Sequence, residues 1–279
     1  MLSGPHSLFT GLALAGLFLS PAVAIALESP WIDTGKATVR LLAAGPAAAR
    51  TPLRAGIEIR LARGWHTYWR YPGDAGVPPR FDWSGSHNLA AVEVRWPAPE
   101  RIPVEGGLES IGYHDNVILP LSIRAKDPSL PVSLRLKLDI GVCEKICIPA
   151  VAMFALDIPA GLSGNEPALD AAEARVPAAA RVGTNKSFGV LAAKLERGKE
   201  PRALIEVVVP VGKPFDLFAE GPSDDWALPL PKRLEASNGR ARFAIPIDGA
   251  PAGGGPTPSK LRLTLVAGSE AVEVVAPLD

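Results

Sequence analysis

The sequence predicts an all-β protein, and two observations carry that prediction. The chain holds 27 glycines and 29 prolines among 279 residues, which is typical of many turns and few long helices. Short apolar runs alternate with polar residues, most clearly over 133–140, with the period of two that marks a half-buried strand. Lys and Arg (29) balance Asp and Glu (29), so no basic field indicates nucleic acid or anionic lipid as a partner.

The amino-terminal residues predict an export signal. Residues 8–23 are apolar and uncharged, and small-x-small cleavage sites follow at Ala22-Val23-Ala24 and Ala24-Ile25-Ala26. An uncleaved anchor is the alternative, but the run is short for a membrane span of about 20 residues. We therefore expect residues 1–26 to be a cleaved signal peptide. The mature chain should then lie in the periplasm, where disulfides persist, without inserting into the membrane.

The first predicted domain, residues 27–160, opens with strands at 31–42 and 54–61 that lead into an aromatic segment. The side chains of this segment would divide between two faces, with Trp65, Thr67 and Trp69 on one and His66, Tyr68 and Arg70 on the other. We interpret one face as core and the other as a rim. The alternatives are an aromatic platform for sugar or a shelf beside the cysteines, which would make Tyr68 a candidate site residue.

Two further segments of this domain read as turn and loop. Residues 72–76 read as a turn by their chemistry, in which Asp74 bonds its own backbone, and Asp74 is also a candidate residue near the cysteine site. Residues 102–116 read as a long loop before a strand at 117–123, and loops of that length are usually functional or disordered. Glycines permit this loop to move, and Leu108 and Ile111 give it apolar tips.

The two cysteines of the chain, Cys143 and Cys147, follow the strand at 133–140. Continuing its alternation places Cys143 on the polar side, so its sulfur is expected near solvent. Residues 151–158 read as the next strand, and a three-residue hairpin loop lets the cysteines face each other across the ladder. Facing Cα atoms lie about 5.5 Å apart, within reach of a disulfide.

Such a pair is a structural staple, a redox-active disulfide or part of a metal site. Closing a five-residue loop stabilises a protein by only about 2 kcal/mol in the chain-entropy model. A chain this long has ample core to bury, which favours a reactive pair at an accessible bend. Lys145 between the cysteines would favour a thiolate and Glu144 would oppose it, so both are candidate site residues.

Residues 161–186 read as a linker with a short helix, because 166–180 is rich in alanine and interrupted by Pro177. Beyond it, residues 187–279 predict a second, smaller β-sandwich from apolar runs at 187–195, 203–209, 240–247, 261–266 and 271–275. This second domain has no residues arranged for chemistry in its sequence, and we interpret it as a packing or spacer module.

The motifs of the first domain, taken together, resemble the N-terminal periplasmic domain of the thiol:disulfide interchange family of DsbD and ScsB. The matching segments, in order, are 65–69, 72–76, 112–113 and 142–149. The resemblance covers roughly residues 30–160 and is closer to the ScsB-type branch. On thinner grounds, the second domain resembles the second sandwich of ScsB-type proteins.

The resemblance implies an immunoglobulin-like sandwich without cofactor or metal, engaged in protein-disulfide reductase-type exchange. Cys147 would form the mixed disulfide with a partner and Cys143 would resolve it. Electrons would come from a thioredoxin-like protein or a separate membrane thiol carrier and pass to periplasmic oxidoreductases, as in cytochrome c biogenesis. The stand-alone chain, without the membrane and thioredoxin-like parts of its relatives, would need that donor as another protein.

Two departures from the family pattern concern the spacing of the cysteines and the cap loop that shields them. DsbD separates its cysteines by five residues and covers them with Phe, whereas this chain has three residues between its cysteines and offers Leu108, Ile111 and Tyr113 as cap residues.

Two other functions stay open. One is periplasmic copper binding or copper tolerance, with His66 or His114 joining the two sulfurs. The other is a non-catalytic binding sandwich with a structural disulfide.

Overall fold

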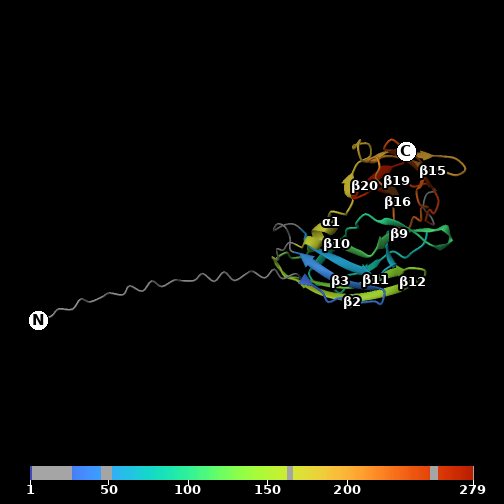
Figure 1. The fold of residues 1–279 in the computed structure, drawn as a ribbon. Helices are drawn as coiled ribbons and strands as arrows, with labels where there is room; N and C mark the ends of the chain where they lie inside the picture. Colours follow the sequence, from blue (N-terminus) through green and yellow to red (C-terminus); the bar gives the residue numbers. More distant parts are fainter. Residues whose placement is uncertain (2–26, 45–51, 162–165, 252–256, 279) are drawn as a thin grey trace.

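The computed structural model describes residues 1, 27–44, 52–161, 166–251 and 257–278, so the predicted signal peptide lies outside the described residues apart from Met1. Two β-sandwiches make up this part of the chain (Figure 1). The first is drawn from blue to yellow-green and the second in orange and red. The predicted all-β class, with one sandwich following another, is confirmed.

The first sandwich packs two six-stranded sheets face to face. Sheet A has the order β1-β3-β4-β10-β7 with β2 on β3, and comprises β1 (Leu27–Glu28), β2 (Ile32–Asp33), β3 (Ala37–Ala44), β4 (Leu53–Leu61), β7 (Leu89–Val94) and β10 (Asn116–Ala125). Sheet B has the order β12-β11-β5-β9-β8 with β6 on β11, and comprises β5 (His66–Gly73), β6 (Arg80–Asp82), β8 (Glu100–Pro103), β9 (Glu109–His114), β11 (Val132–Cys143) and β12 (Cys147–Ile158).

Alternation of side chains explains why these strands form a sandwich. Leu134, Leu136 and Leu138 on β11 are buried, while the residues between them reach the surface. They join one hydrophobic core with residues of sheet A such as Ile57 and Leu119. The apolar face of each sheet is thereby removed from water, which is the dominant stabilisation of such a fold.

The segment between the two sandwiches contacts the first through helix α1 (Pro167–Glu173) and the second through strand β13 (Ala178–Ala180). Helix α1 places Leu169 against Leu42 on sheet A, and Arg54 forms ion pairs with Asp170 and Glu173. The predicted helix does not continue to residue 180, because β13 pairs in parallel with β20. Pro177 has no backbone N–H to continue a helix, and directly after it the chain enters the second sandwich as β13.

The second sandwich packs two four-stranded sheets. Sheet C has the order β13-β20-β19-β16, with β16 (Phe215–Glu220), β19 (Lys260–Ala267) and β20 (Glu270–Pro277). Sheet D has the order β14-β15-β18-β17, and comprises β14 (Gly189–Glu196), β15 (Arg202–Val208), β17 (Lys232–Ser237) and β18 (Arg240–Pro246). The five strands expected here are confirmed, while β13, β16 and β17 were not predicted. The domain boundaries at 160/161 and 186/187 stay predictions.

The two sandwiches share an interface along β5. The β5–β9 ladder is interrupted between Tyr68 and Gly73, and three residues in that gap, Trp69, Arg70 and Tyr71, contact the second sandwich. Trp69 packs against Phe218, with ring centroids 6.0 Å apart, and Phe218 belongs to the core of the first sandwich. Arg70 forms ion pairs with Glu220 and Glu273, and the Tyr71 hydroxyl donates to the Leu228 carbonyl.

A second contact lies on β8, where Arg101 forms an ion pair with Asp216 at 2.7 Å. The second sandwich therefore sits on the β5, β9 and β8 side of sheet B. The opposite edge strand, β12, lies on the side of the first sandwich away from it (Figure 1).

The predicted long loop at 102–116 is wrong, because β8 and β9 form a hairpin there, closed by a 3-10 turn η1 (Glu105–Gly107). Its glycines serve close packing and a tight turn rather than movement. A Cβ on Gly112 would lie 2.0 Å from the Thr67 carbonyl oxygen, and Gly106 at the turn has a φ of 80°. Among the described residues, no helix is long and apolar enough to cross a membrane.

Candidate functional site

The two cysteines meet at the bend between β11 and β12. They are directly opposite each other in the antiparallel register and form a disulfide, with Cα atoms 4.2 Å apart. That separation is close to the spacing of the narrow pairs in an antiparallel ladder. The predicted hairpin and its pairing of Cys143 with Cys147 are confirmed. Glu144 and Lys145 are exposed at the bend between them.

The two cysteine residues differ in their exposure to solvent. Cys147 is exposed, whereas Cys143 is only 2% exposed. The expectation that Cys143 lies near solvent is therefore wrong, although its side of the strand is as predicted. Its neighbours on β5 cover it: His66 is its partner across the ladder, and the Tyr68 hydroxyl lies beside its sulfur.

Tyr68 contacts both sulfurs through its hydroxyl. The oxygen lies 2.7 Å from Sγ of Cys143 and 3.1 Å from Sγ of Cys147. A disulfide carries no proton, so the hydroxyl donates to the sulfurs. Burial raises the pKa of Tyr68, which keeps the hydroxyl protonated and able to donate. Tyr68 thus belongs to a shelf beside the cysteines, and the expectation of an exposed rim on this face is wrong.

Two glycines that sequence reasoning missed hold the ring of Tyr68. A Cβ on Gly76 would lie 2.4 Å from Cε1 of Tyr68, and one on Gly141 would lie 3.0 Å from Cε2. The ring therefore occupies a slot between the 74–79 segment and β11 that any side chain at Gly76 would fill. Because the slot fixes the ring, it also fixes the direction in which the hydroxyl points.

Two histidines, His66 and His114, lie level with Cys143 on the next two strands of sheet B. Cys143 pairs with His66 on β5, and His66 pairs with His114 on β9, with the two imidazole centroids 5.8 Å apart. Nε2 of His66 is buried and has no hydrogen-bond partner among the described residues. Burial lowers the pKa of His66, and the nearby His114 lowers it further. The part of the chain that is described holds no group of three His, Cys, Asp or Glu placed to bind a metal ion.

The comparison with protein families identifies the first sandwich. The family described as "Thiol:disulfide interchange protein DsbD, N-terminal" matches residues 38–158, which include the disulfide and Tyr68. Residues 38–158 form a DsbD N-terminal domain. The fold of the first sandwich is accordingly the immunoglobulin-like fold predicted from the sequence.

A solved structure extends this likeness over both sandwiches. The N-terminal periplasmic domain of ScsB from Proteus mirabilis has the same fold, with a TM-score of 0.69 and 20% sequence identity. The match covers 91% of this chain and 99% of that one. No curated protein is significantly similar to the chain in sequence.

The residues that the family resemblance assigned to a cap loop do not gather at the sulfurs of this DsbD N-terminal domain. Ile111 and Tyr113 belong to the hydrophobic core, and the Tyr113 hydroxyl donates to the Pro97 carbonyl at 2.8 Å. Leu108 is exposed, and it lines a hollow of about 580 Å³ between the sandwiches. The groups that cover Cys143 come instead from β5.

Asp74 also has a different role from the one expected. Its carboxylate accepts a hydrogen bond from the backbone N–H of Glu109 at 3.2 Å, and its own N–H donates to the Glu109 carbonyl at 2.9 Å. Asp74 therefore joins the segment after β5 to the β8–β9 hairpin. It supports the 74–79 segment that covers the Tyr68 ring, rather than contacting sulfur.

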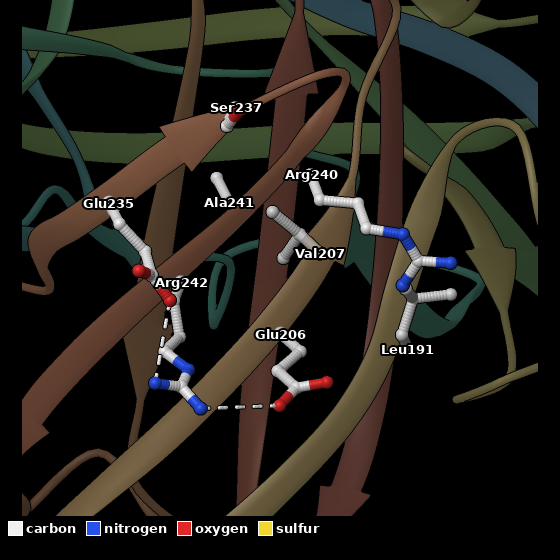
Figure 2. A pocket seen from close by; sticks show the side chains of 8 residues that line it. All are labelled: Leu191, Glu206, Val207, Glu235, Ser237, Arg240, Ala241 and Arg242. Carbon is white, nitrogen blue, oxygen red and sulfur yellow. Dashed lines mark ion pairs between the residues drawn. The ribbon is translucent and has the colours of Figure 1, made fainter.

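The second sandwich has a hollow of about 280 Å³ on the outer face of sheet D (Figure 2). Figure 2 shows Arg242 reaching between Glu206 and Glu235, at distances of 3.7 and 3.4 Å. Arg242 pairs with both glutamates, and together with Arg240 the lining holds two positive and two negative side chains, so the hollow has no net charge. It contains no cysteine or histidine, in contrast with the site in the DsbD N-terminal domain.

Proposed function

We propose that this protein carries out thiol–disulfide exchange in the periplasm through Cys143 and Cys147. It would pass reducing equivalents from a thioredoxin-like donor or a membrane thiol carrier to periplasmic oxidoreductases. One observation carries the proposal: the disulfide joins an exposed cysteine, Cys147, to a buried one, Cys143. Exchange requires access to the attacked sulfur, which the exposed Cys147 supports, and stabilisation of the thiolate that leaves, which the Tyr68 hydroxyl beside Sγ of Cys143 supports.

The reductive half-reaction transfers two electrons to the pair. A donor thiolate attacks Sγ of Cys147, the Cys143–Cys147 bond breaks, and Cys143 leaves as a thiolate. The second thiolate of the donor then attacks the donor sulfur in the mixed disulfide. The donor leaves as a disulfide, and Cys143 and Cys147 take up two protons from water. The oxidative half-reaction runs in reverse with an acceptor disulfide.

Tyr68 would assist this reaction at the leaving sulfur. Its hydroxyl donates to Sγ of Cys143, where negative charge develops as the disulfide opens. Hydrogen bonds to charged groups are stronger than those to neutral ones, so the contact stabilises the transition state more than the starting disulfide. Lys145 at the exposed bend favours the thiolate of Cys147, and Glu144 opposes it.

Trapping with single-cysteine variants tests the proposal. Cys143→Ser leaves Cys147 without a resolving thiol, so incubation with an oxidised thioredoxin-like protein should accumulate a mixed disulfide, visible on a non-reducing gel. Cys147→Ser leaves only the buried thiol and should trap little. Equally poor trapping by both variants, with a wild-type disulfide that resists strong reductant in the folded protein, would establish a structural staple instead.

Copper binding is the second candidate, and the unpaired Nε2 of His66 beside Cys143 favours it. Reduction of the disulfide would free two thiolates, which are soft ligands suited to Cu(I), next to an imidazole. The reduced protein should then retain one equivalent of Cu(I) against a competing chelator. His66→Gln should weaken that retention while leaving disulfide exchange intact. Loss of all Cu(I) to the chelator in the wild type would dismiss this role.

A further inference from the structure

The outer face of β12 carries an apolar stripe that begins at the exposed Cys147. Side chains alternate along this strand, and its exposed positions are Cys147, Pro149, Val151, Met153 and Ala155 before the first charge at Asp157. Val151 is 54% exposed and Met153 73% exposed, and Ile146 at the bend is 68% exposed. Residues two apart along a strand are about 6.7 Å apart, so the stripe extends about 20 Å from Cys147 to Met153.

Charged side chains border the stripe on one side. Val151 faces Asp139 across the ladder, and Met153 faces Lys137. These two charges lie on the outer face of β11, 3.9 Å from each other. An apolar centre with a charged border is the usual composition of a protein–protein interface.

The stripe is free of the second sandwich. That sandwich contacts β5 and β8, toward the other end of sheet B, whereas β12 is the terminal strand on the far side (Figure 1). Exposed apolar side chains that adjoin a reactive group indicate a binding surface rather than chance. Any protein that exchanges with Cys147 must bring its own sulfur into bonding contact there, and its surface around that sulfur then lies over the stripe.

We propose that the stripe formed by Ile146, Pro149, Val151 and Met153 is the docking surface for the redox partner. The partner it fits is a thioredoxin-like protein whose Cys-X-X-Cys pair lies in an apolar, uncharged surface. A charged surface would lose its hydration against Val151 and Met153 without a compensating partner. This inference rests on the proposed exchange function, and it assigns recognition to residues that take no part in the chemistry.

The test compares a protein reductant with a small one. The rate constant for reduction of the Cys143–Cys147 disulfide is measured with reduced thioredoxin and with dithiothreitol, for the wild type and for Val151→Asp. Val275→Asp is the matched control, because Val275 is 56% exposed on a strand of the second sandwich. Val151→Asp should slow the thioredoxin reaction about tenfold, as expected for loss of a central apolar contact, and leave the dithiothreitol reaction unchanged. Val275→Asp should change neither.

A second variant guards against an effect of charge sign or of folding. Met153→Lys introduces the opposite charge on the same stripe and should slow the thioredoxin reaction as well. Equal thioredoxin rates for Val151→Asp, Met153→Lys and Val275→Asp would overturn the docking surface. So would a wild type that thioredoxin reduces no faster than dithiothreitol does, or variants slowed equally with both reagents.

Two other outcomes identify a different error. A wild-type disulfide that neither reagent reduces in the folded protein would overturn the exchange function itself, and with it this inference. A second copy of the chain is the alternative occupant of the stripe. A wild-type dimer in sedimentation that Val151→Asp converts to a monomer, with unchanged thioredoxin rates, would assign the stripe to self-association and overturn the proposal.

Discussion

The two sandwiches of this protein share one construction and differ in what their outer faces carry. Both bury an alternating apolar face, and both have charged and polar side chains between the buried positions. On sheet B of the first, the outer face carries a disulfide, a buried tyrosine hydroxyl and an apolar stripe. On sheet D of the second, Arg242 forms ion pairs with the two glutamates beside it. The fold is common to both, and chemistry depends on the few residues placed on its surface.

The largest effect is expected at the interface between the two sandwiches, where an ion pair is mostly buried. Arg70→Met removes the arginine that pairs with Glu220 and Glu273 in a mostly buried setting, and should lower the free energy of unfolding by about 3 kcal/mol. Arg242→Met, in the exposed network of sheet D, should cost less than about 1 kcal/mol. Urea unfolding of both variants measures the difference. Equal losses would mean that the interface contributes no more than a surface ion pair.

A smaller effect is expected from the hydroxyl at the disulfide. Tyr68→Phe keeps the ring in its slot and removes the donor to Sγ of Cys143, so reduction by dithiothreitol should slow about tenfold, because a hydrogen bond to a charged sulfur is worth about 1.5–3 kcal/mol.

Tyr113→Phe is the matched control for this prediction. It removes a buried hydroxyl that donates to the Pro97 carbonyl, on the other face of the same sheet. It should lower stability by about 1–3 kcal/mol and leave the reduction rate as in the wild type. If both variants reduce at the wild-type rate, Tyr68 is a packing residue and the chemistry at the bend needs no donor.

The smallest effect concerns pH. Burial and His114 hold the pKa of His66 below its ordinary value of 6.5, so the unfolded chain binds this proton more readily than the folded one. The stability contributed by neutral His66 is therefore present above pH 6.5 and falls as the pH drops below it, by less than about 1.4 kcal/mol per pH unit. His66→Gln should flatten the profile measured by urea unfolding between pH 7 and pH 5.

Residues 187–279 contain no histidine, so the second sandwich contributes no histidine to this pH dependence. The exposed His87 in the first sandwich supplies the control variant His87→Gln, which should keep the wild-type profile. A profile that stays steep in His66→Gln would assign the acid sensitivity to other groups.

The features that could be predicted from the sequence are local ones. The alternation over 133–140 located β11, and the short spacing of the cysteines predicted their hairpin and their pairing, because residues so near in sequence have few other ways to meet. The family resemblance rested on the same short segments and was confirmed.

The features that could not be predicted depend on residues distant in sequence. Cys143 is buried because Tyr68, 75 positions earlier, lies over it, and no pattern near Cys143 carries that information. The loop expected at 102–116 is a hairpin, because Gly112 allows β9 to approach β5 closely. The sequence alone does not distinguish a glycine needed for such close packing from a glycine in a flexible loop. The alternation of β12 does carry a signal for the stripe: apolar residues occupy both of its faces, which a half-exposed strand does not need.

Phe218 has a practical consequence for anyone who shortens this protein. Its ring belongs to the core of the first sandwich although the residue lies on β16 of the second. Leu230, from the segment between β16 and β17, also belongs to that core. A gene product ending near residue 186 would keep the disulfide and every group around it, yet it would expose Trp69 to water. Such a fragment should be prone to aggregation. Poor solubility on truncation would then reflect the apolar surface that Phe218 normally covers in the first sandwich, and not damage to the redox centre.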